Sequence, residues 1–390
     1  MFADLIDYYL RWYHSKPVAI TPGRRDELRR LHACLYKCAE HIAAHYMDYV
    51  PRWIPLSDKE LSLLEYQSKY PFRAGTWRPD YIICRDGTLK ICEITSRFFG
   101  HGIFLSWFAE RAADRFMERF PDKKRETHYD ELLEYLLKMV EGHRRIVVLK
   151  SADRTSAIKL YKRFFELNGH EVSVIESYET EARRREWEQG AFVISALNQA
   201  DILSYSMDTL RAMADAGISA DFRNTFLIHD KRFMQLWFED SFTGACLDAG
   251  ETAFLRSHAI PTFDCSAPGN ADIMEDARRH KDKYIVKPYR LGKSEGVHAG
   301  VLTSEDEWNA LDLEGSILQP FLEQKTYPVD WEGHRYDDYL CGMMLCVDDR
   351  YFDSGMFRAS SLPVTNVGDD RKACAIHTGD PEILSQCDVL

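Results

Sequence analysis

A lysine and a glycine-rich loop form the first chemically informative segment of this sequence. Lys287 follows the apolar run Tyr284–Val286 and precedes Pro288, after which comes the loop Gly292-Lys293-Ser294-Glu295-Gly296. Glycines let backbone N–H groups approach phosphate oxygens closely, and lysine supplies a compact positive charge. The loop lacks the GxxxxGK[ST] spacing of a Walker A motif and leads into a strand pattern instead of a helix. It therefore indicates either a phosphate-binding segment or a plain β-hairpin.

A second lysine lies where an apolar run turns into a helix pattern. The run Thr225–Ile228 is typical of a short strand, and a helix is expected from Asp230 onward. Positive side chains are unfavourable in the first turn of a helix unless an anion joins them. Lys231 and Arg232 therefore indicate a bound phosphate, with a solvent-facing pair as the alternative.

A third segment is suited to a ligand's ring. The apolar run Ser316–Leu318 ends in Gln319-Pro320 and continues with Phe321 and Leu322. Because proline cannot donate to a strand ladder, the backbone groups beside it stay available for a ligand. The simpler interpretation is an edge strand.

Two carboxylates are expected to meet across a hairpin. Tyr81–Cys84 and Leu89–Ile94 are typical of strands, and the turn Arg85-Asp86-Gly87 joins them. This pairing brings Asp80 near Glu93. Converging carboxylate oxygens suit Mg²⁺ that is bound together with substrate phosphates, although each carboxylate taken singly is a common surface charge.

The order of these segments resembles the circularly permuted ATP-grasp superfamily, in particular the synthetase domain of glutathionylspermidine synthetase. The family's Arg-x-Asp and Glu-x-Asn pattern is matched by Arg78, Asp80 and Glu93, with Thr95 in place of the asparagine. The resemblance implies an ATP-grasp fold with a permuted core and a preceding α/β layer. It also implies ATP and Mg²⁺ as cofactors, with the metal held by Asp80, Glu93 and Thr95. A threonine offers only a hydroxyl, so its contact with the metal would be weaker or through water.

The same resemblance implies a role for each nucleotide-binding segment. Lys231 and Lys287 would contact the ATP phosphates under the loop Gly292–Gly296, and the adenine would lie beside Gln319–Leu322.

The implied activity is a carboxylate–amine ligase. A substrate carboxylate takes the γ-phosphoryl group of ATP, and an amine converts the resulting acyl phosphate to an amide. Arg78 and Arg358 would face the acyl phosphate. Arg97 would bind a substrate carboxylate and His101 would act as a base for the amine, whereas an ion pair and a helix cap are their structural alternatives. The expected substrates are an amino acid or small peptide, in specialised metabolism.

Three other functions fit the same segments. The first is a ligase that modifies a peptide or protein tail. The second is a non-catalytic ATP-binding protein, for which Thr95 is the best argument. The third is a small-molecule kinase that stops at the phosphorylated product. No Ser-His-Asp or Cys-His arrangement is visible in the sequence, and phosphoryl transfer requires none.

Composition narrows the class of partner. Fifty Lys and Arg against 62 Asp and Glu give a net charge of −12, and no long basic run is present, so neither nucleic acid nor an anionic membrane is expected as a partner. No window of roughly 18 residues is free of charge, and the N-terminus lacks the basic region of a signal peptide. The ten cysteines form no CxxC pair, which indicates free thiols in a reducing cytoplasm. The sequence leaves the oligomeric state open.

The expected elements place the chain in the mixed α/β class. Strands at Arg145–Leu149, Val172–Ile175 and Ala191–Ser195 alternate with helix patterns, which favours a parallel sheet. Further strands are expected at Val297–Leu302, Tyr339–Val347 and Tyr351–Phe357, and helices throughout 1–66 and at Arg24–Tyr46, Ile103–Val140 and Thr155–Asn168. We expect a helical region (1–70), a metal-binding segment (71–140), an α/β domain (141–255) and a nucleotide-binding subdomain (256–390).

Overall fold

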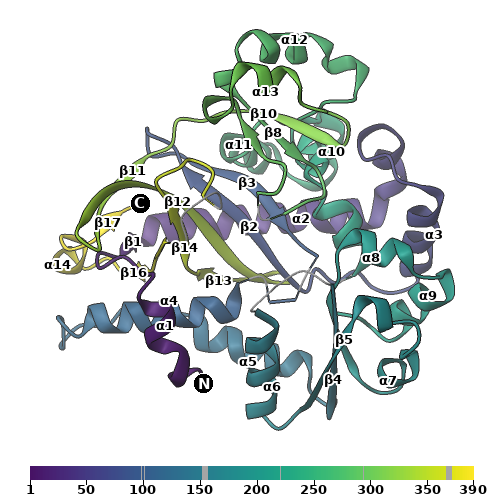
Figure 1. Cartoon of the computed structure of the whole chain (residues 1–390), viewed down its shortest axis with the longest axis horizontal. Coiled ribbons are helices and arrows are strands. Elements are labelled where there is room, and N and C mark those ends of the chain that lie inside the picture. Colours follow the sequence, from purple (N-terminus) through teal and green to yellow (C-terminus); the bar gives the residue numbers. More distant parts are fainter. Residues whose placement is uncertain (98, 101, 152–156, 220, 293, 366–370) are drawn as a thin grey trace.

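The structure is a computed structural model of the chain (Figure 1), and it describes residues 1–97, 99–100, 102–151, 157–219, 221–292, 294–365 and 371–390. Over these ranges helices and strands are mixed along the chain, so the expected α/β class is confirmed. The four domain boundaries stay a prediction.

An antiparallel sheet of seven strands, the central sheet, lies in the middle of the molecule. Its main path runs β15-β14-β12-β2-β3, and β11 and β13 also pair with β12. The strands are β2 (Thr76–Ile83), β3 (Leu89–Thr95), β11 (Thr326–Trp331), β12 (His334–Val347), β13 (Arg350–Ser354), β14 (Phe357–Ser360) and β15 (Arg371–Ala373). The expected hairpin of β2 and β3 is confirmed, with Gly87 at φ 84° in its turn.

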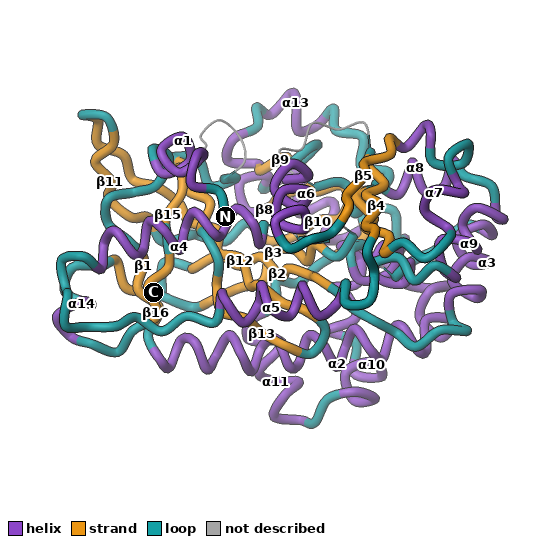
Figure 2. Tube along the Cα trace, turned by 90° about the horizontal axis from the view of Figure 1, so that it is seen from below, coloured by secondary structure: helices purple, strands orange, loops and turns teal. Residues whose placement is uncertain are grey.

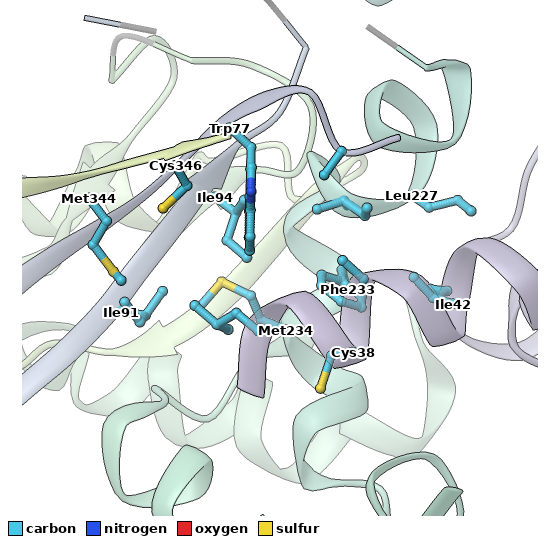
Figure 3. Packing of buried hydrophobic residues seen from close by; sticks show 14 of the residues in the cluster. Cys38, Ile42, Trp77, Ile91, Ile94, Leu227, Phe233, Met234, Met344 and Cys346 are labelled. Carbon is cyan, nitrogen blue, oxygen red and sulfur yellow. The ribbon is translucent and has the colours of Figure 1, made fainter. Parts of the chain in front are cut away.

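Helix α2 (Pro22–Trp53) runs across β2 and β3 in Figure 1. Thr21 caps its start by accepting a hydrogen bond from the backbone N–H of Arg24. The helix packs against β13 and against the segment that follows residue 223. Figure 3 shows Ile42 of α2 beside Phe233, with Ile91 and Ile94 of β3 in the same apolar cluster. This cluster takes one face of β2 and β3, so the other face is available for polar residues.

A second, smaller sheet lies above the end of β3 in Figure 1. Its order is β7-β10-β8-β9, and each of its pairings is antiparallel. The strands are β7 (Phe263–Asp264), β8 (Tyr284–Pro288), β9 (His298–Ala299) and β10 (Ser316–Pro320). Helices α12 (Ala271–Arg279) and α13 (Glu305–Asn309) cover it, and the indole of Trp308 donates a hydrogen bond to the carbonyl oxygen of Ala277.

The expected parallel layer is present as the sheet β5-β4-β6. Its strands are β4 (Arg145–Lys150), β5 (Glu171–Glu176) and β6 (Phe192–Ala196). The surrounding helices are α4 (Ile103–Met117), α5 (Tyr129–Met139), α6 (Ala157–Leu167), α7 (Arg184–Glu188), α8 (Gln199–Ser204) and α9 (Met207–Asp215). Figure 2 shows α4 and α5 along the underside of the molecule. The helical region expected at Ile103–Val140 is thus two helices instead of one.

A parallel three-stranded sheet joins the two ends of the chain. Its order is β16-β1-β17, with β1 (Val18–Ile20), β16 (Ala375–His377) and β17 (Asp388–Val389). Strand β1 lies within the region expected to be entirely helical, so that expectation is corrected. The other helices are α1 (Ile6–Leu10), α3 (Asp58–Gln67), α10 (Asp240–Cys246), α11 (Ala249–His258) and α14 (Pro381–Leu384). Single 3₁₀ turns lie at Ala3–Leu5, Ser177–Glu179, Pro268–Asn270, Lys281–Lys283 and Gly300–Leu302.

Three of the strands expected from the sequence are wrong, one in its type and two in their bounds. Thr225–Ile228 lies in a π-helical turn, η3 (Asn224–Ile228), followed by the 3₁₀ helix η4 (Lys231–Phe238). All five residues of η3 are buried, and a short apolar run that is buried all round does not distinguish strand from helix. Only His298–Ala299 of Val297–Leu302 pairs as a strand, and Tyr351–Phe357 is divided between β13 and β14.

All ten cysteines carry free thiols, as the sequence indicates. Among the described residues, no helix combines the length and the apolar character that crossing a membrane requires.

Candidate functional site

A cleft of about 780 Å³ lies between the smaller sheet and the central sheet. Apolar side chains of both sheets and of the segment after β10 form its walls, among them Ile82, Ile285, Phe321 and Leu322. Its polar lining includes Glu93, Lys231, Lys287, Ser294, Gln319 and Arg358. The fold thus brings together eight residues that the sequence marks as candidate site residues.

Strand register places the polar residues of the β2–β3 hairpin on one face. Arg78 pairs with Thr95, and Asp80 pairs directly with Glu93. Because side chains alternate along a strand and paired residues share a face, all four lie on the face away from the apolar cluster. This is the face that borders the cleft.

Asp80 lies beneath the lining of the cleft and has no exposed surface. Its Oδ1 accepts a hydrogen bond from Arg78 Nε at 2.6 Å, and its Oδ2 accepts from Arg78 Nη2 at 2.8 Å and from Arg358 Nη2 at 2.5 Å. Burial raises the pKa of Asp80, and the two guanidinium groups oppose that rise. Asp80 therefore orients both arginines, and its expected metal contact stays a prediction.

Glu93 is the carboxylate that reaches the cleft. Its Oε2 lies 3.9 Å from Lys231 Nζ. Burial disfavours the ionised form, but the positive charges of Lys231, Arg358 and Lys287 outweigh burial and lower the pKa of Glu93 to about 2. Glu93 is therefore ionised at neutral pH and offers the hard oxygen that Mg²⁺ prefers.

Lys231 and Lys287 direct positive charge to the cleft from two different segments. Lys231 Nζ donates a hydrogen bond of 2.6 Å to the carbonyl oxygen of Leu291, and Lys287 Nζ donates one of 3.2 Å to that of Cys92. Burial lowers the pKa of Lys231, and the Glu93 carboxylate opposes that effect. The described lining therefore has three cationic side chains and one carboxylate, that of Glu93. The third cation is Arg358, and the excess of positive charge attracts anions to the cleft.

Gln319 offers a hydrogen-bond acceptor at the apolar end of the cleft. Its Nε2 donates to Thr262 Oγ1 at 2.8 Å, whereas its buried Oε1 has no hydrogen-bond partner in the part of the chain that the structure describes. A buried acceptor without a partner is unusual in a folded protein. Beside Phe321 and Leu322, this oxygen suits the amino group of a purine ring.

The glycine-rich loop borders both the cleft and Arg97. Ser294 lines the cleft in the left-handed region, with φ 59°. A Cβ atom at Gly292 would lie 3.2 Å from Arg97 Nη2, and one at Gly296 would lie 2.8 Å from the ring of Pro288. At Gly296 the backbone therefore lies too close to the ring of Pro288 for a residue with a Cβ atom. Lys293 lies outside the described residues.

The remaining expected residues are not part of the cleft lining that the structure describes. Arg78 and Thr95 lie on the same face without lining the cleft. Arg97 is buried, and its Nη1 donates a hydrogen bond of 3.3 Å to Gln199 Oε1. His101 lies outside the described residues. Within the described ranges, no three His, Cys, Asp or Glu side chains converge as a metal-binding group.

Sequence reasoning missed three buried polar residues near the site. Thr262 and Gln199 follow no motif, and only their contacts with Gln319 and Arg97 identify them. His229 lies two residues before Lys231, and its Nδ1 lies 3.1 Å from the carbonyl oxygen of Ile94, next to Glu93. The basic cluster around Lys231 could have drawn attention to this histidine.

One comparison with known proteins gives a match. A family model described as the AnkG N-terminal domain matches residues 31–227, slightly more than half of the 390-residue chain. No curated protein matches the sequence.

This match corrects the resemblance to the ATP-grasp superfamily, because the family model that fits the chain is that of a different family. The resemblance was carried by single residues and dipeptides separated by long intervals. The match includes Arg78, Asp80 and Glu93 and ends before Lys231.

Proposed function

This chain belongs to the AnkG N-terminal domain family, and we propose that its cleft binds ATP for the ADP-forming ligation of a carboxylate to an amine. One observation carries the proposal. Lys231, Lys287, Glu93 and Arg358, which come from separate segments of the chain, line one cleft of about 780 Å³ whose other end is apolar.

The cleft is apolar at one end and positively charged at the other, so a nucleoside triphosphate fits it in one orientation. The adenine fits at Phe321 and Leu322, where Gln319 Oε1, which has no partner among the described residues, accepts a hydrogen bond from its amino group. The phosphates fit at the Lys231 and Lys287 ammonium groups, which bind anionic oxygens as compact charges.

Mg²⁺ fits the same end of the cleft with Glu93 as one protein ligand. Magnesium usually binds proteins through one or two carboxylates together with substrate phosphates, so a three-residue cage is not required. Among the residues that the structure describes, Glu93 has an ion pair with Lys231 at 3.9 Å and no hydrogen bond to its carboxylate, whereas both oxygens of Asp80 are bonded to arginines. When bound, the ion neutralises charge that develops on the phosphates.

The reaction that suits these residues is activation of a carboxylate. The substrate carboxylate oxygen attacks the γ-phosphorus, the bond from this phosphorus to the β,γ-bridging oxygen breaks, and ADP leaves. An amine then attacks the acyl carbon of the acyl phosphate, which releases phosphate and a proton and leaves an amide. Lys231, Lys287 and Arg358 stabilise negative charge through both steps, which is the main task of a protein in phosphoryl transfer.

Arg358 is held in place for this role. Its Nη2 is bonded to the fully buried Asp80, and its positive charge also lowers the pKa of Glu93. Arg78 binds the same carboxylate from the neighbouring position on β2. A fixed guanidinium group stabilises a developing anion without first reorganising.

A non-catalytic ATP-binding protein is the second candidate. The observation that favours it is Asp80, whose two oxygens are already engaged by Arg78 and Arg358. Such a protein would bind ATP at the same residues without releasing ADP. For either candidate, the free thiols fit a location in the cytoplasm.

The test is ADP release from Mg²⁺-ATP with pools of amino acids and small peptides, with and without hydroxylamine. Hydroxylamine converts an acyl phosphate to a hydroxamate, so pool-dependent ADP release with hydroxamate supports the ligase. ADP release that needs no amine and gives a stable phosphorylated product would identify a kinase. ATP binding without turnover in every pool would favour the non-catalytic protein, and turnover with peptides alone would identify a tail-modifying ligase. Absence of ATP binding would overturn the proposal.

A further inference from the structure

A pair of cysteine thiols lies outside the cleft, between two helices that pack against each other. Cys38 belongs to α2, and Cys246 is the last residue of α10. Their Sγ atoms are 3.9 Å apart, although 208 positions separate the two residues along the chain. Close by, the rings of His41 on α2 and Phe242 on α10 meet edge to face, with centroids 5.4 Å apart. The packing of the two helices therefore brings two sulfur atoms from distant segments into contact.

The two thiols differ in their access to solvent. Cys38 lies in the apolar cluster (Figure 3) and has no exposed surface. Cys246 is only partly buried, and Ala245 immediately before it is exposed. A reagent in solution can therefore reach Cys246, whereas Cys38 is accessible only to Cys246.

The hydrogen bonds of the pair assign a different role to each thiol. Cys246 Sγ lies 3.4 Å from the carbonyl oxygen of Phe242, which only accepts, so the Cys246 S–H donates there and the Cys38 S–H donates to Cys246. This hydrogen bond from Cys38 lowers the pKa of Cys246 against the opposing effects of burial and of the Glu251 charge, and Lys37 adds a smaller lowering effect. Burial raises the pKa of Cys38. Because the thiolate is the nucleophile, Cys246 is the first of the two to react.

A second pair of cysteines, Cys92 and Cys341, lines the cleft and cannot be bridged in the same way. Their side chains are hydrogen-bonded, but strand β2 lies between β3 and β12, which carry them. Cys341 pairs with Ile82, and Ile82 pairs with Lys90, two residues before Cys92. Two strand spacings amount to about 10 Å, whereas a disulfide requires Cα atoms within about 7 Å. The contact between α2 and α10 has no intervening element of this kind.

We propose that Cys38 and Cys246 are a modification site, at which a low-molecular-weight disulfide converts the two thiols to a reversible intramolecular disulfide. The Cys246 thiolate attacks one sulfur of the small disulfide, whose S–S bond breaks and whose other half leaves. Cys38 then attacks Cys246 Sγ, the mixed disulfide breaks, and the second half leaves. The two protein thiols are oxidised by two electrons, the small disulfide is reduced to two thiols, and these take up the two protons. An excess of the small thiol reverses both steps, as for the transient disulfides of cytosolic proteins.

The bond would tie a longer segment of the chain to α2. Phe242 of α10 packs against Phe233 of η4, with ring centroids 6.1 Å apart. Helix η4 begins at Lys231. The oxidised chain would therefore hold both α10 and η4 against α2 by a covalent bond.

The test incubates the full chain with oxidised glutathione under native conditions, quenches the reaction with acid and blocks the remaining thiols with N-ethylmaleimide. Mass spectrometry of a digest then identifies the peptides that are joined. We expect a pair of peptides that joins Cys38 to Cys246 and separates after reduction with dithiothreitol. Cys92 and Cys341 should both carry the blocking group, and they serve as the control pair within the same molecule.

Variants separate the two steps. In Cys38→Ser the reaction should stop at a glutathione adduct on Cys246. In Cys246→Ser the buried Cys38 should be modified at least about tenfold more slowly than Cys246 is in Cys38→Ser. Cys34→Ser is the matched control, because Cys34 is buried one turn before Cys38 on the same helix, and this variant should form the disulfide as the wild type does.

The wild-type digest decides the proposal even where a variant fails to fold. Recovery of Cys38 with the blocking group, under conditions in which Cys246 carries glutathione, would overturn it. A disulfide between Cys34 and Cys246 would also overturn it, and so would a Cys246 that oxidised glutathione leaves unmodified.

Discussion

Lys231 Nζ donates a hydrogen bond of 2.6 Å to the carbonyl oxygen of Leu291, the residue before the glycine-rich loop. The same ammonium lies 3.9 Å from Glu93 Oε2 on β3. The backbone N–H of Lys231 also donates to the carbonyl oxygen of Tyr289 at 2.9 Å. Lys231 therefore links the start of the loop to the central sheet. A phosphate bound at Lys231 would contact the same ammonium group that holds the loop.

Lys231→Met should weaken ATP binding by about 10- to 100-fold, because a charge-assisted hydrogen bond to a ligand contributes about 1.5–3 kcal/mol. Isothermal titration calorimetry with Mg²⁺-ATP measures this change. Lys69→Met is the control, since Lys69 is exposed and contacts the ring of Tyr66. Wild-type affinity in Lys231→Met would contradict the assignment of the phosphates to this end of the cleft.

Glu93→Gln should lower turnover on the order of 100-fold while ATP still binds. The amide keeps the shape of the side chain but removes the charge that attracts Mg²⁺ and repels phosphate. ATP should therefore bind the variant at least as tightly as wild type when Mg²⁺ is chelated. Steady-state ADP release over a Mg²⁺ titration measures the first effect, and calorimetry in a chelator measures the second. Glu323→Gln, an exposed residue paired with Arg85, is the control, and full activity of Glu93→Gln would show that Glu93 does not bind the metal.

Much of the candidate site could be predicted from local sequence. Glu93, Lys287 and Gln319 lie in or at the ends of short strands whose alternation and flanking turns are readable from a few residues. The position of Asp80 between two arginines could not be predicted in the same way. Arg78 is two residues away, but Arg358 is separated from Asp80 by 278 positions. Spacing along the chain carries no information about such a contact.

The fold also has parts that the local sequence predicts and parts that it does not. The β2–β3 hairpin is local, because the turn at Gly87 and the paired strands are adjacent in sequence. The segment Thr225–Ile228 is apolar and β-branched at its ends, so its local pattern favours a strand. In the structure it is enclosed on all sides and adopts a π-helical turn, with Asn224 donating to the carbonyl oxygens of Arg73 and Ala74. Tertiary packing overrides local preference there.

Arg25→Ala should destabilise the fold by about 3–5 kcal/mol, because it leaves the buried carboxylate of Asp353 without its cation. Arg25 Nε and Nη2 each lie 2.6 Å from an oxygen of Asp353, and both side chains are under 10% exposed. Urea denaturation followed by tryptophan fluorescence measures the loss. Arg29→Ala on the same helix is the control, because the Arg29–Asp26 pair is exposed and should contribute at most about 1 kcal/mol. Equal losses in the two variants would contradict a specific role for the buried pair.

The same pair predicts a pH dependence of stability. Burial alone would raise the pKa of Asp353, but the hydrogen bond from Arg25 and the positive charges of His377, Arg25 and His128 together outweigh burial and lower it below the ordinary value of 3.8. A carboxyl group whose pKa is lower in the folded state stabilises the fold above its unfolded pKa, and this contribution is lost as the pH falls through the folded value. Asp353→Asn should therefore be less stable than wild type at pH 7, and the difference should shrink as the pH falls from about 5 towards about 3. Denaturation midpoints of both proteins across this range measure the effect. A difference that stayed constant with pH would mean that the charge of Asp353 does not contribute to stability, and that the substitution acts only by changing the packing around Arg25.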